Sequence, residues 1–519
     1  MKVVIDFWKA WRREIIFGVG ILSLAFILRT YKLTYLPIFG DEAIYIRWAQ
    51  IMRVEPGLRF VPLSDGKQPL FMWSVIPFIK IFSDPLFAGR IVSALSGVGT
   101  SVGVFVLSYL LFKNRFSACV AAFIYALSPY AVFFDRMALV DSMLTFFGVW
   151  TLVFAIITSK KARLDSSMIA GFFLGGALLT KSPGIFFVLL LPTVLILAKW
   201  PKSLKRRFSK VSVFVFLFSF TYAIAYGMYN ILRLGSEFHM VGIRNKDYVY
   251  PLGHIFERPF DPLMPFLDRA VEWFWMLGPS VLLVLVLSGI VIHFRKNVKE
   301  VVLLAAWAFI PLVVSAEYAK VFTARYLLFI FPYLVVLASV VFLPIGGLLS
   351  KNRKRLLGLL FVIFVIHAFW INYLILVNVD AAPLPRSERS GYLEEWTAGT
   401  GIYEVSEKIR ERHKLFPDQK IVVGTEGYFG TLPNGLQVYL NDLVDITVVG
   451  VGLDFSEVPE SLLESKRAGN TTYFVVNDSR LFVYAREVGL NLLAAYPKAK
   501  RPDGSRETLL FFEVVKVVN

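Results

Sequence analysis

The sequence predicts a polytopic α-helical membrane protein with about eleven transmembrane helices and a C-terminal extracytoplasmic α/β domain. Three observations support this prediction. The 519 residues are 56% hydrophobic and 18% charged, with a mean hydropathy of +0.63, against about 45–50% apolar and 25% charged in soluble domains. Apolar runs long enough to cross about 30 Å of hydrocarbon recur along residues 1–379. Residues 380–519 are less apolar and contain short β-rich runs.

The net charge of +17 is unevenly distributed along the chain. Residues 380–519 carry 16 Lys and Arg against 20 Asp and Glu, whereas residues 1–379 carry 39 against 18. Basic charge interleaved with membrane spans indicates topology, so we expect no nucleic-acid partner. The single cysteine, Cys119, excludes an intrachain disulfide and a Cys-based metal site.

Eleven apolar runs are candidate transmembrane helices. They are residues 15–33, 87–112, 116–134, 138–158, 166–180, 183–199, 211–232, 273–293, 300–316, 326–347 and 356–377. The stretch 69–83 is shorter and contains Pro77. We interpret it as a partial or surface helix, because a full crossing there would break the alternation of loops described next.

Six connections between these runs are rich in basic residues, with 22 Lys and Arg in 48 residues. They are residues 1–14, 113–115, 159–166, 199–210, 295–300 and 351–355. The positive-inside rule makes them cytoplasmic, so the long loops 34–68 and 233–272 lie on the outer face. An odd number of spans places the C-terminal region outside as well. We therefore predict a multi-pass protein of the cell (plasma) membrane, surrounded by membrane lipids.

The predicted division into domains is 1–379, the transmembrane part, and 380–519, an extracytoplasmic α/β domain docked on its outer surface. Strand candidates in the second domain are short and β-branched or aromatic, and one amphipathic helix precedes them. The strand candidates are 421–424, 446–452, 473–476 and 509–517, and the helix is 401–416. Strands that alternate with helix are typical of an α/β domain.

Ionisable side chains at the ends of spans are costly, so each is a hypothesis for a functional residue. Here an adjacent carboxylate pair and several cations lie on the outer face. A carboxylate suits proton transfer, whereas Lys and Arg suit a phosphate, which at membrane depth implies a lipid phosphate. Snorkelling anchors remain an alternative for the cations, and a helix N-cap remains one for Asp41. The candidates are Asp41, Glu42, Lys67, Gln68, Arg136, Asp141, Lys181, Arg244, Arg325 and Tyr326.

Several of these residues lie in segments that resemble the protein O-mannosyltransferase and aminoarabinose transferase superfamily. The segments are DEAIYIRWA (41–49), KQPLFMWSVIPF (67–78), AGRIVSALSG (88–97), SPYAVFFDRMALVDSMLTFF (128–147), LLTKSPG (178–184) and ARYLL (324–328). The superfamily consists of polytopic glycosyltransferases of the GT-C fold that use polyprenyl-phosphate sugars. The resemblance covers about the first 200 residues well and the rest of the membrane part loosely.

The resemblance implies roles for the residues of the first outer loop. Asp41 matches the acidic residue taken as the catalytic base in that family, and Glu42 matches its partner. Lys67 falls where members have a basic residue or His before Pro-Pro. Gln68 departs from that pattern, because this chain has Lys-Gln-Pro.

The resemblance also implies that Arg136 and Asp141 match the Arg and Asp of the second outer turn, and that Lys181 matches the Lys before Gly-Pro or Ser-Pro. Together with Arg244, Arg325 and Tyr326, they are expected to bind the substrate.

The predicted function is hexosyl or pentosyl transfer from a polyprenyl-phosphate donor to a hydroxyl of a lipid, glycan or protein acceptor. One displacement with a single general base, Asp41, inverts the anomeric centre. No cofactor is assigned, because the sequence shows no compelling metal cage and several cations could take the place of a divalent metal. A divalent metal stays an open alternative without support in the sequence. Two alternatives stay open, namely a transporter or lipid flippase and a non-catalytic envelope assembly subunit. Ionisable residues at span ends on one face disfavour the transporter.

Overall fold

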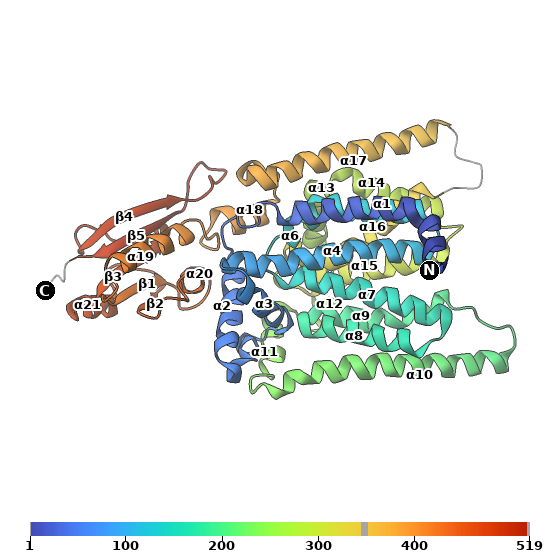
Figure 1. Cartoon of the computed structure of the whole chain (residues 1–519), viewed down its shortest axis with the longest axis horizontal. Coiled ribbons are helices and arrows are strands. Elements are labelled where there is room, and N and C mark those ends of the chain that lie inside the picture. The colour runs from blue at the N-terminus through green and yellow to red at the C-terminus, as the bar shows by residue number, and fades with distance from the viewer. Residues whose placement is uncertain (1, 344–350, 516–519) are drawn as a thin grey trace. The chain divides into compact units, whose positions relative to one another are not determined.

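The computed structural model describes residues 2–343 and 351–515, which form a bundle of helices and one five-stranded sheet (Figure 1). The chain divides into two compact units. The helical unit consists of residues 1–31, 60–71 and 90–385, and the mixed unit of residues 32–59, 72–89 and 386–519. The C-terminal segment therefore does not form its compact unit alone, because most of the loop after the first helix packs with it.

The helical unit is built mainly from apolar helices of different lengths. They are α1 (Lys2–Thr30), α4 (Pro85–Phe112), α5 (Arg115–Leu127), α6 (Pro129–Asp135), α7 (Val140–Lys161), α8 (Leu164–Thr180), α9 (Ile185–Leu190), α10 (Leu204–Tyr229), α13 (Leu263–Leu277), α14 (Ser280–His293), α15 (Val298–Tyr318), α16 (Phe331–Ser339) and α17 (Lys351–Val377). Short helices connect them, namely η2 (Val61–Asp65), η3 (Ser182–Gly184), η4 (Leu191–Leu197), η6 (Ala324–Ile330), η7 (Val340–Phe342), α11 (Met240–Tyr248) and α12 (His254–Glu257).

Each predicted span coincides with a helix or a run of short helices. Among the described residues, six helices are long and apolar enough to cross a membrane, or up to eight if each bent pair forms one span. The number of eleven therefore stays a prediction. The last four residues of the predicted span 326–347 lie outside the described residues. The stretch predicted as a partial helix forms α3 (Leu70–Ile81), whose 12 residues are fewer than a full crossing needs.

Two of the predicted spans are bent. Helices α5 and α6 meet at 56°, and α13 and α14 meet at 111°. In each case the break lies at a proline, Pro129 in Ser-Pro and Pro279 in Gly-Pro. Proline has no amide hydrogen and clashes with the preceding turn, so a continuous helix cannot pass through it without a kink.

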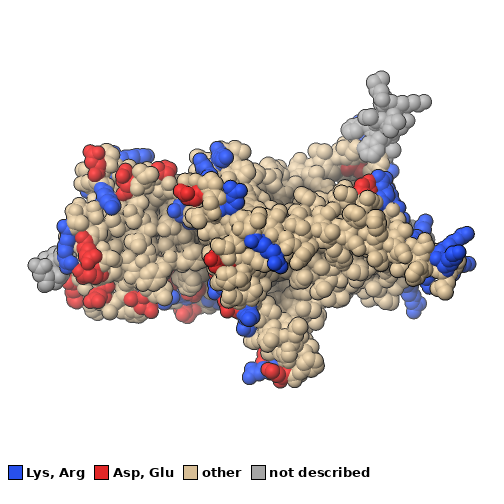
Figure 2. All heavy atoms as spheres, turned by 90° about the horizontal axis from the view of Figure 1, so that it is seen from below, with Lys and Arg blue, Asp and Glu red and all other residues tan. Residues whose placement is uncertain are grey.

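The basic connections of the helical unit gather at helix ends. Helices α1, α10 and α17 all begin at the same end of the bundle in Figure 1. Figure 2 shows Lys and Arg at the end where α10 begins, next to a broad surface without charged atoms. Residues 202–209 are all exposed. Which membrane face these loops occupy stays a prediction.

The mixed unit contains a sheet in the order β2-β1-β3-β5-β4. The strands are β1 (Ile421–Glu426), β2 (Ile446–Gly452), β3 (Thr471–Asn477), β4 (Leu490–Pro497) and β5 (Thr508–Val514). Strand β1 runs parallel to β2 and β3, and β5 runs antiparallel to β3 and β4. Helices α19 (Ile402–Leu415), α20 (Thr431–Tyr439) and α21 (Glu460–Arg467) accompany it. Four of the strands were predicted, whereas the edge strand β4 was not.

Helix α2 (Gly40–Val54) belongs to the mixed unit and packs on α20. Gln50 Nε2 donates to the carbonyl of Val438 at 2.9 Å, and the rings of Trp48 and Phe429 lie 5.9 Å apart. The backbone of Gly40 donates to the carbonyl of Thr397 at 3.1 Å. These contacts hold the start of α2, and thus the predicted carboxylate pair, on the rest of this unit.

Candidate functional site

The predicted carboxylate pair lies in the first turn of α2, and its two members differ in environment. The N-cap of the helix is Phe39, not Asp41. Glu42 is fully buried, and its Oε2 accepts the backbone N–H of Phe39 at 2.9 Å. The alternative interpretation of Asp41 as the N-cap is therefore wrong, because Glu42 performs the capping. Asp41 is partly exposed on the second residue of the helix.

The backbone around Asp41 is fixed by close packing. A Cβ atom at Gly40 would lie 2.9 Å from Oγ1 of Thr431 at the start of α20, so a glycine permits this approach. Negative charge in the first turn is favoured by the helix dipole. The structure thus presents Asp41 on a rigid element, which is what a positioned general base requires.

Lys67 in the helical unit is a partly buried cation with a neutral partner. Its Nζ donates to the hydroxyl of Tyr248 at 3.2 Å and lies 4.5 Å from the centre of that ring. Among the described residues, no carboxylate pairs with it. A partly buried ammonium without an anion is electrostatically unsatisfied. Lys67 is therefore the best placed of the predicted cations to bind an anionic group.

Three separate segments of the chain, including helix α11, meet around Lys67. Gln68 Nε2 donates to Ser182 Oγ at 2.9 Å, and Ser182 Oγ donates to Asn245 Oδ1 at 3.1 Å. Next to Asn245, Arg244 Nε donates to Asp65 Oδ1 at 3.0 Å. The set Asp65, Lys67, Gln68, Ser182, Arg244, Asn245 and Tyr248 is called the loop network below. The hydrogen bond from Arg244 to Asp65 and the charge of that carboxylate raise the pKa of Arg244, so the guanidinium stays charged.

Lys181 adjoins the loop network through its chain neighbour Ser182. It follows the last residue of α8, and its Nζ lies 2.7 Å from Asp141 Oδ1 and 4.0 Å from the centre of the Tyr326 ring. The guanidinium carbon of Arg325 lies 5.3 Å from the same ring. The structure thus brings four of the predicted residues together around Tyr326.

Arg136 is buried and caps a helix. Its Nη1 donates to the carbonyls of Leu28 at 3.0 Å and Tyr31 at 2.8 Å, at the end of α1. Beside it, Asp135 Oδ2 accepts from Arg29 Nε at 2.9 Å, with both side chains fully buried. Carbonyls at a helix end lack partners within the helix, so a cation there is stabilising. The sequence did not reveal this structural task.

Sequence reasoning missed four members of the loop network, Asp65, Ser182, Asn245 and Tyr248. Asp65 lies two residues before Lys67, Ser182 directly follows Lys181, and Asn245 and Tyr248 stand in the segment RNKDYVY among cations. Single polar residues of these types have no spacing that marks them. Within residues 2–343 and 351–515, no group of three or more His, Cys, Asp or Glu side chains is arranged to hold a metal ion.

Comparisons with known proteins give one family and several similar folds. The model of the family "Dolichyl-phosphate-mannose-protein mannosyltransferase" matches residues 66–226. The crystal structure of ArnT from Cupriavidus metallidurans in the apo state has a TM-score of 0.58 at 15% identity, covering 97% of this chain and 98% of that one. The same protein bound to undecaprenyl phosphate has a TM-score of 0.54 at 15% identity, with the same coverage.

A third similar structure is the archaeal oligosaccharyltransferase AglB from Archaeoglobus fulgidus, in complex with an inhibitory peptide and a dolichol-phosphate. Its TM-score is 0.52 at 14% identity, covering 91% of this chain and 70% of that one. No curated protein matches the chain by sequence. At these identities the structural likeness concerns the fold.

Proposed function

We propose that this chain is a membrane glycosyltransferase of the GT-C superfamily and that it moves a sugar from a polyprenyl-phosphate donor to an acceptor hydroxyl. The reaction takes place at the outer face of the plasma membrane and inverts the anomeric centre. The proposal is supported by the polyprenyl phosphate in the ArnT structure and the dolichol-phosphate in the AglB structure.

The observation that carries the proposal is the convergence of three chain segments on Lys67. As the glycosidic bond breaks, the charge of the lipid phosphate grows from about one toward two negative charges. A fixed cation at that phosphate stabilises the transition state more than the ground state. Lys67 fits this task because its described partner, Tyr248, is neutral. The next residue, Gln68, ties this segment to Ser182 through a side-chain hydrogen bond.

The other predicted cations are proposed to assist. Lys181 is already paired with Asp141 and Arg244 with Asp65, so they offer positive potential and their remaining N–H donors to the phosphate. Arg325 and Tyr326 lie beside Lys181 and would line the same region. Arg136 holds the end of α1 and is also proposed to bind the donor.

Asp41 is proposed to be the general base. The acceptor hydroxyl gives its proton to the Asp41 carboxylate as its oxygen forms a bond to the anomeric carbon. At the same time the bond from that carbon to the phosphate oxygen breaks, and polyprenyl phosphate leaves with the electron pair. A single displacement of this kind inverts the anomeric centre. Glu42 would act indirectly, by fixing the first turn of the helix that carries Asp41.

The test uses the full chain in lipid nanodiscs with a polyprenyl-phosphate sugar as the probe. Lys67→Met should weaken donor binding by about 10- to 150-fold, because a charge-assisted bond is worth about 1.5–3 kcal/mol. Lys299→Gln is the control variant. Lys299 is an exposed lysine at the start of α15, and the length of this helix places it about 30 Å from the opposite end of α15. Equal donor affinity in Lys67→Met and wild type would contradict the proposal.

The same preparation distinguishes the two alternatives. A glycosyltransferase releases polyprenyl phosphate and a new glycoside in equal amounts. Passage of intact donor across the bilayer of a liposome, without bond breakage, would indicate a transporter or flippase. A chain that neither binds nor consumes any donor would fit an assembly subunit.

A further inference from the structure

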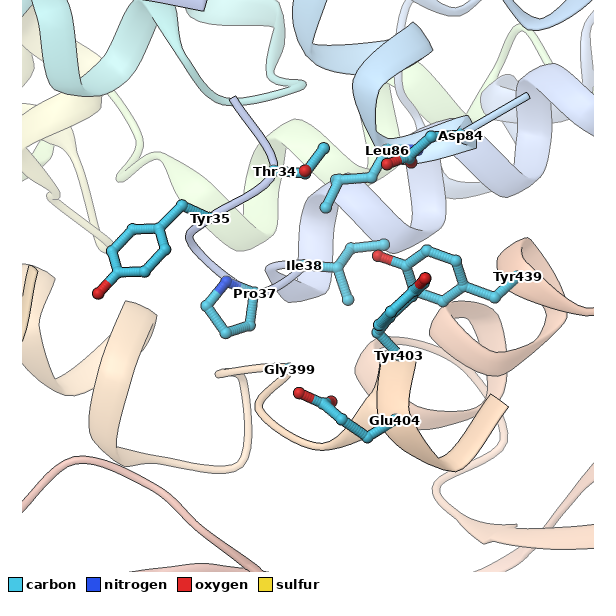
Figure 3. A pocket seen from close by; sticks show the side chains of 10 residues that line it. All are labelled: Thr34, Tyr35, Pro37, Ile38, Asp84, Leu86, Gly399, Tyr403, Glu404 and Tyr439. Carbon is cyan, nitrogen blue, oxygen red and sulfur yellow. The ribbon is translucent and has the colours of Figure 1, made fainter. Parts of the chain in front are cut away.

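The mixed unit contains a pocket of about 240 Å³ that the donor chemistry does not use. Figure 3 shows it between the segment that precedes α2, the start of α4, and the facing surfaces of α19 and α20. It is open to solvent, since Tyr35 and Tyr403 at its wall are about half exposed. Drug-sized ligands occupy pockets of about 300–1,000 Å³, so this pocket suits a smaller molecule.

The lining combines aromatic rings with carboxylates and lacks cations. Tyr35, Tyr403 and Tyr439 contribute rings, Asp84 and Glu404 contribute carboxylates, and no Lys or Arg is among the lining residues. The two carboxylates would repel a phosphate or a carboxylate here. A sugar ring offers apolar C–H faces for aromatic rings and hydroxyl donors for carboxylates. The chemistry of this pocket therefore differs from that of the cationic loop network.

The geometry leaves polar atoms available for such hydroxyls. The ring centres of Tyr403 and Tyr439 lie 5.3 Å apart, and the angle between the ring planes is 73°. The edge of one ring therefore contacts the face of the other. Asp84 Oδ1 accepts the backbone N–H groups of Leu86 at 2.9 Å and Phe87 at 3.1 Å. Among the described residues, nothing donates to Asp84 Oδ2 or to Glu404.

The hydroxyl of Tyr403 is kept protonated by its surroundings. The charge of Glu407, then burial, then the charges of Asp84 and Glu404 raise the pKa of Tyr403. A protonated phenol both donates and accepts, as recognition of a sugar hydroxyl requires.

The pocket lies close to Asp41 along the chain. Ile38 lines it, and three residues later comes Asp41. Three residues span at most about 10–11 Å. The neighbouring backbone is rigid, because Phe39 forms a bridge with Ala398. A ligand in this pocket would therefore sit near the proposed base.

We propose that this pocket binds a neutral monosaccharide ring that belongs to the acceptor, so that the acceptor is a glycan. The assignment to the acceptor rests on the proposed function, whereas the binding of a sugar ring does not. The carboxylates hold the hydroxyls, the tyrosines pack on the ring, and the fixed distance to Asp41 delivers a neighbouring hydroxyl to the base.

The experiment measures binding of methyl α-glycosides of mannose, glucose and galactose to the full chain by saturation-transfer NMR, with glucosamine as the amine probe. We expect at least one neutral glycoside to bind. Tyr403→Ala and Glu404→Gln should each weaken that binding at least fivefold. Glu411→Gln makes the same chemical change on an exposed residue of α19 outside the pocket, and should leave binding unchanged.

Three outcomes would overturn the proposal. They are no glycoside binding to wild type, equal binding by the pocket variants, or a preference for the amine that Glu404→Gln abolishes. A second readout separates this proposal from the proposed function. If the pocket is the acceptor site, Tyr403→Ala loses transfer to a glycan but retains donor binding. A wild type that binds glycosides yet never cleaves a donor would refute the glycosyltransferase and leave a sugar-binding pocket.

Discussion

The ammonium of Lys181 lies 2.7 Å from Oδ1 of Asp141, and only 5% of the Asp141 side chain is exposed. The pair joins the end of α8 to the first turn of α7. A cation at a helix C-terminus and an anion at a helix N-terminus both complement the helix dipoles. The same lysine therefore has a structural task besides the substrate-binding task proposed for it, and the two can be separated.

Lys181→Met should destabilise the protein by about 1–3 kcal/mol, because it leaves the buried Asp141 carboxylate without its partner. The double variant Lys181→Met/Asp141→Asn should regain most of that stability, since the unpaired charge is gone. It should not regain donor affinity if Lys181 contacts the phosphate. Thermal unfolding and donor titration of both variants measure the two effects. Recovery of donor affinity in the double variant would limit Lys181 to its structural task.

Gly66 decides how closely the loop that carries Lys67 approaches α11. Its φ is +66°, and an added Cβ would lie 2.6 Å from the Cβ of Arg244. Gly66→Ala should therefore cost about 1–2 kcal/mol of backbone strain and displace Arg244 and Lys67 together, which lowers donor affinity. Gly253→Ala is the matched control, because nothing lies within 4 Å of its added Cβ. Donor affinity that is equal in both variants would show that the loop network tolerates the shift.

The fold was predictable because membrane spans and strands are periodic signals. The predicted fold class, a polytopic helical protein of GT-C type, is confirmed. The strand predicted at 446–452 coincides with β2. A run of β-branched residues indicates a strand without any information from the rest of the chain. The edge strand β4 was missed, since its residues Leu490–Pro497 alternate poorly between apolar and polar. The packing of α2 with the C-terminal segment depends on contacts between residues about 390 positions apart, such as Gln50 and Val438, which no local pattern encodes.

The site was predictable where one residue type carries the chemistry. Charged residues such as Lys67 and Lys181 stand out in an apolar sequence. Tyr248 and Asn245 do not, because their roles arise only when the loops meet. The capping role of Glu42 instead of Asp41 depends on where the helix begins, and element boundaries are the least certain part of a sequence-based prediction.

Lys498 should make the stability of the mixed unit rise with pH in the alkaline range. Only 2% of this lysine is exposed, and burial, opposed by the charges of Glu507 and Glu426, lowers its pKa to about 8. An unfolded lysine has a pKa of about 10.4. Between these values the folded chain releases the proton while the unfolded chain keeps it, so stability increases by up to about 1.4 kcal/mol per pH unit. Below pH 8 both states are protonated and the burial penalty is fully present.

The measurement is the urea midpoint for proteolysis of residues 386–515 between pH 7.5 and 9.5. Wild type should show a midpoint that rises with pH. Lys498→Met should show a flatter profile, because the titrating group is gone. Equal slopes in the two proteins would mean that Lys498 does not titrate in this range.

Asp41 and Glu42 are adjacent carboxylates for which the structure predicts opposite behaviour. Asp41→Asn keeps the shape of the side chain and leaves the Glu42 cap intact, but it removes the proton acceptor. Turnover should fall by at least about 100-fold, within the range that general base catalysis contributes, while donor binding survives. Stability should change little, because Asp41 is not the N-cap. Transfer of the sugar from the donor, measured together with donor affinity and thermal unfolding, tests these three statements.

Glu42 supplies the matched comparison. Glu42→Gln retains an oxygen that can accept the Phe39 N–H. Turnover should therefore stay within about threefold of wild type, and the free energy of unfolding within about 0.5 kcal/mol. Glu42→Ala leaves that N–H without its acceptor and should cost about 1 kcal/mol or more of stability, with a loss of turnover that follows the loosened first turn. A Glu42→Gln enzyme that is inactive, next to an Asp41→Asn enzyme with ordinary turnover, would move the base by one residue. Ordinary turnover in both would remove the carboxylate pair from the mechanism, since neither would then accept the proton of the attacking hydroxyl.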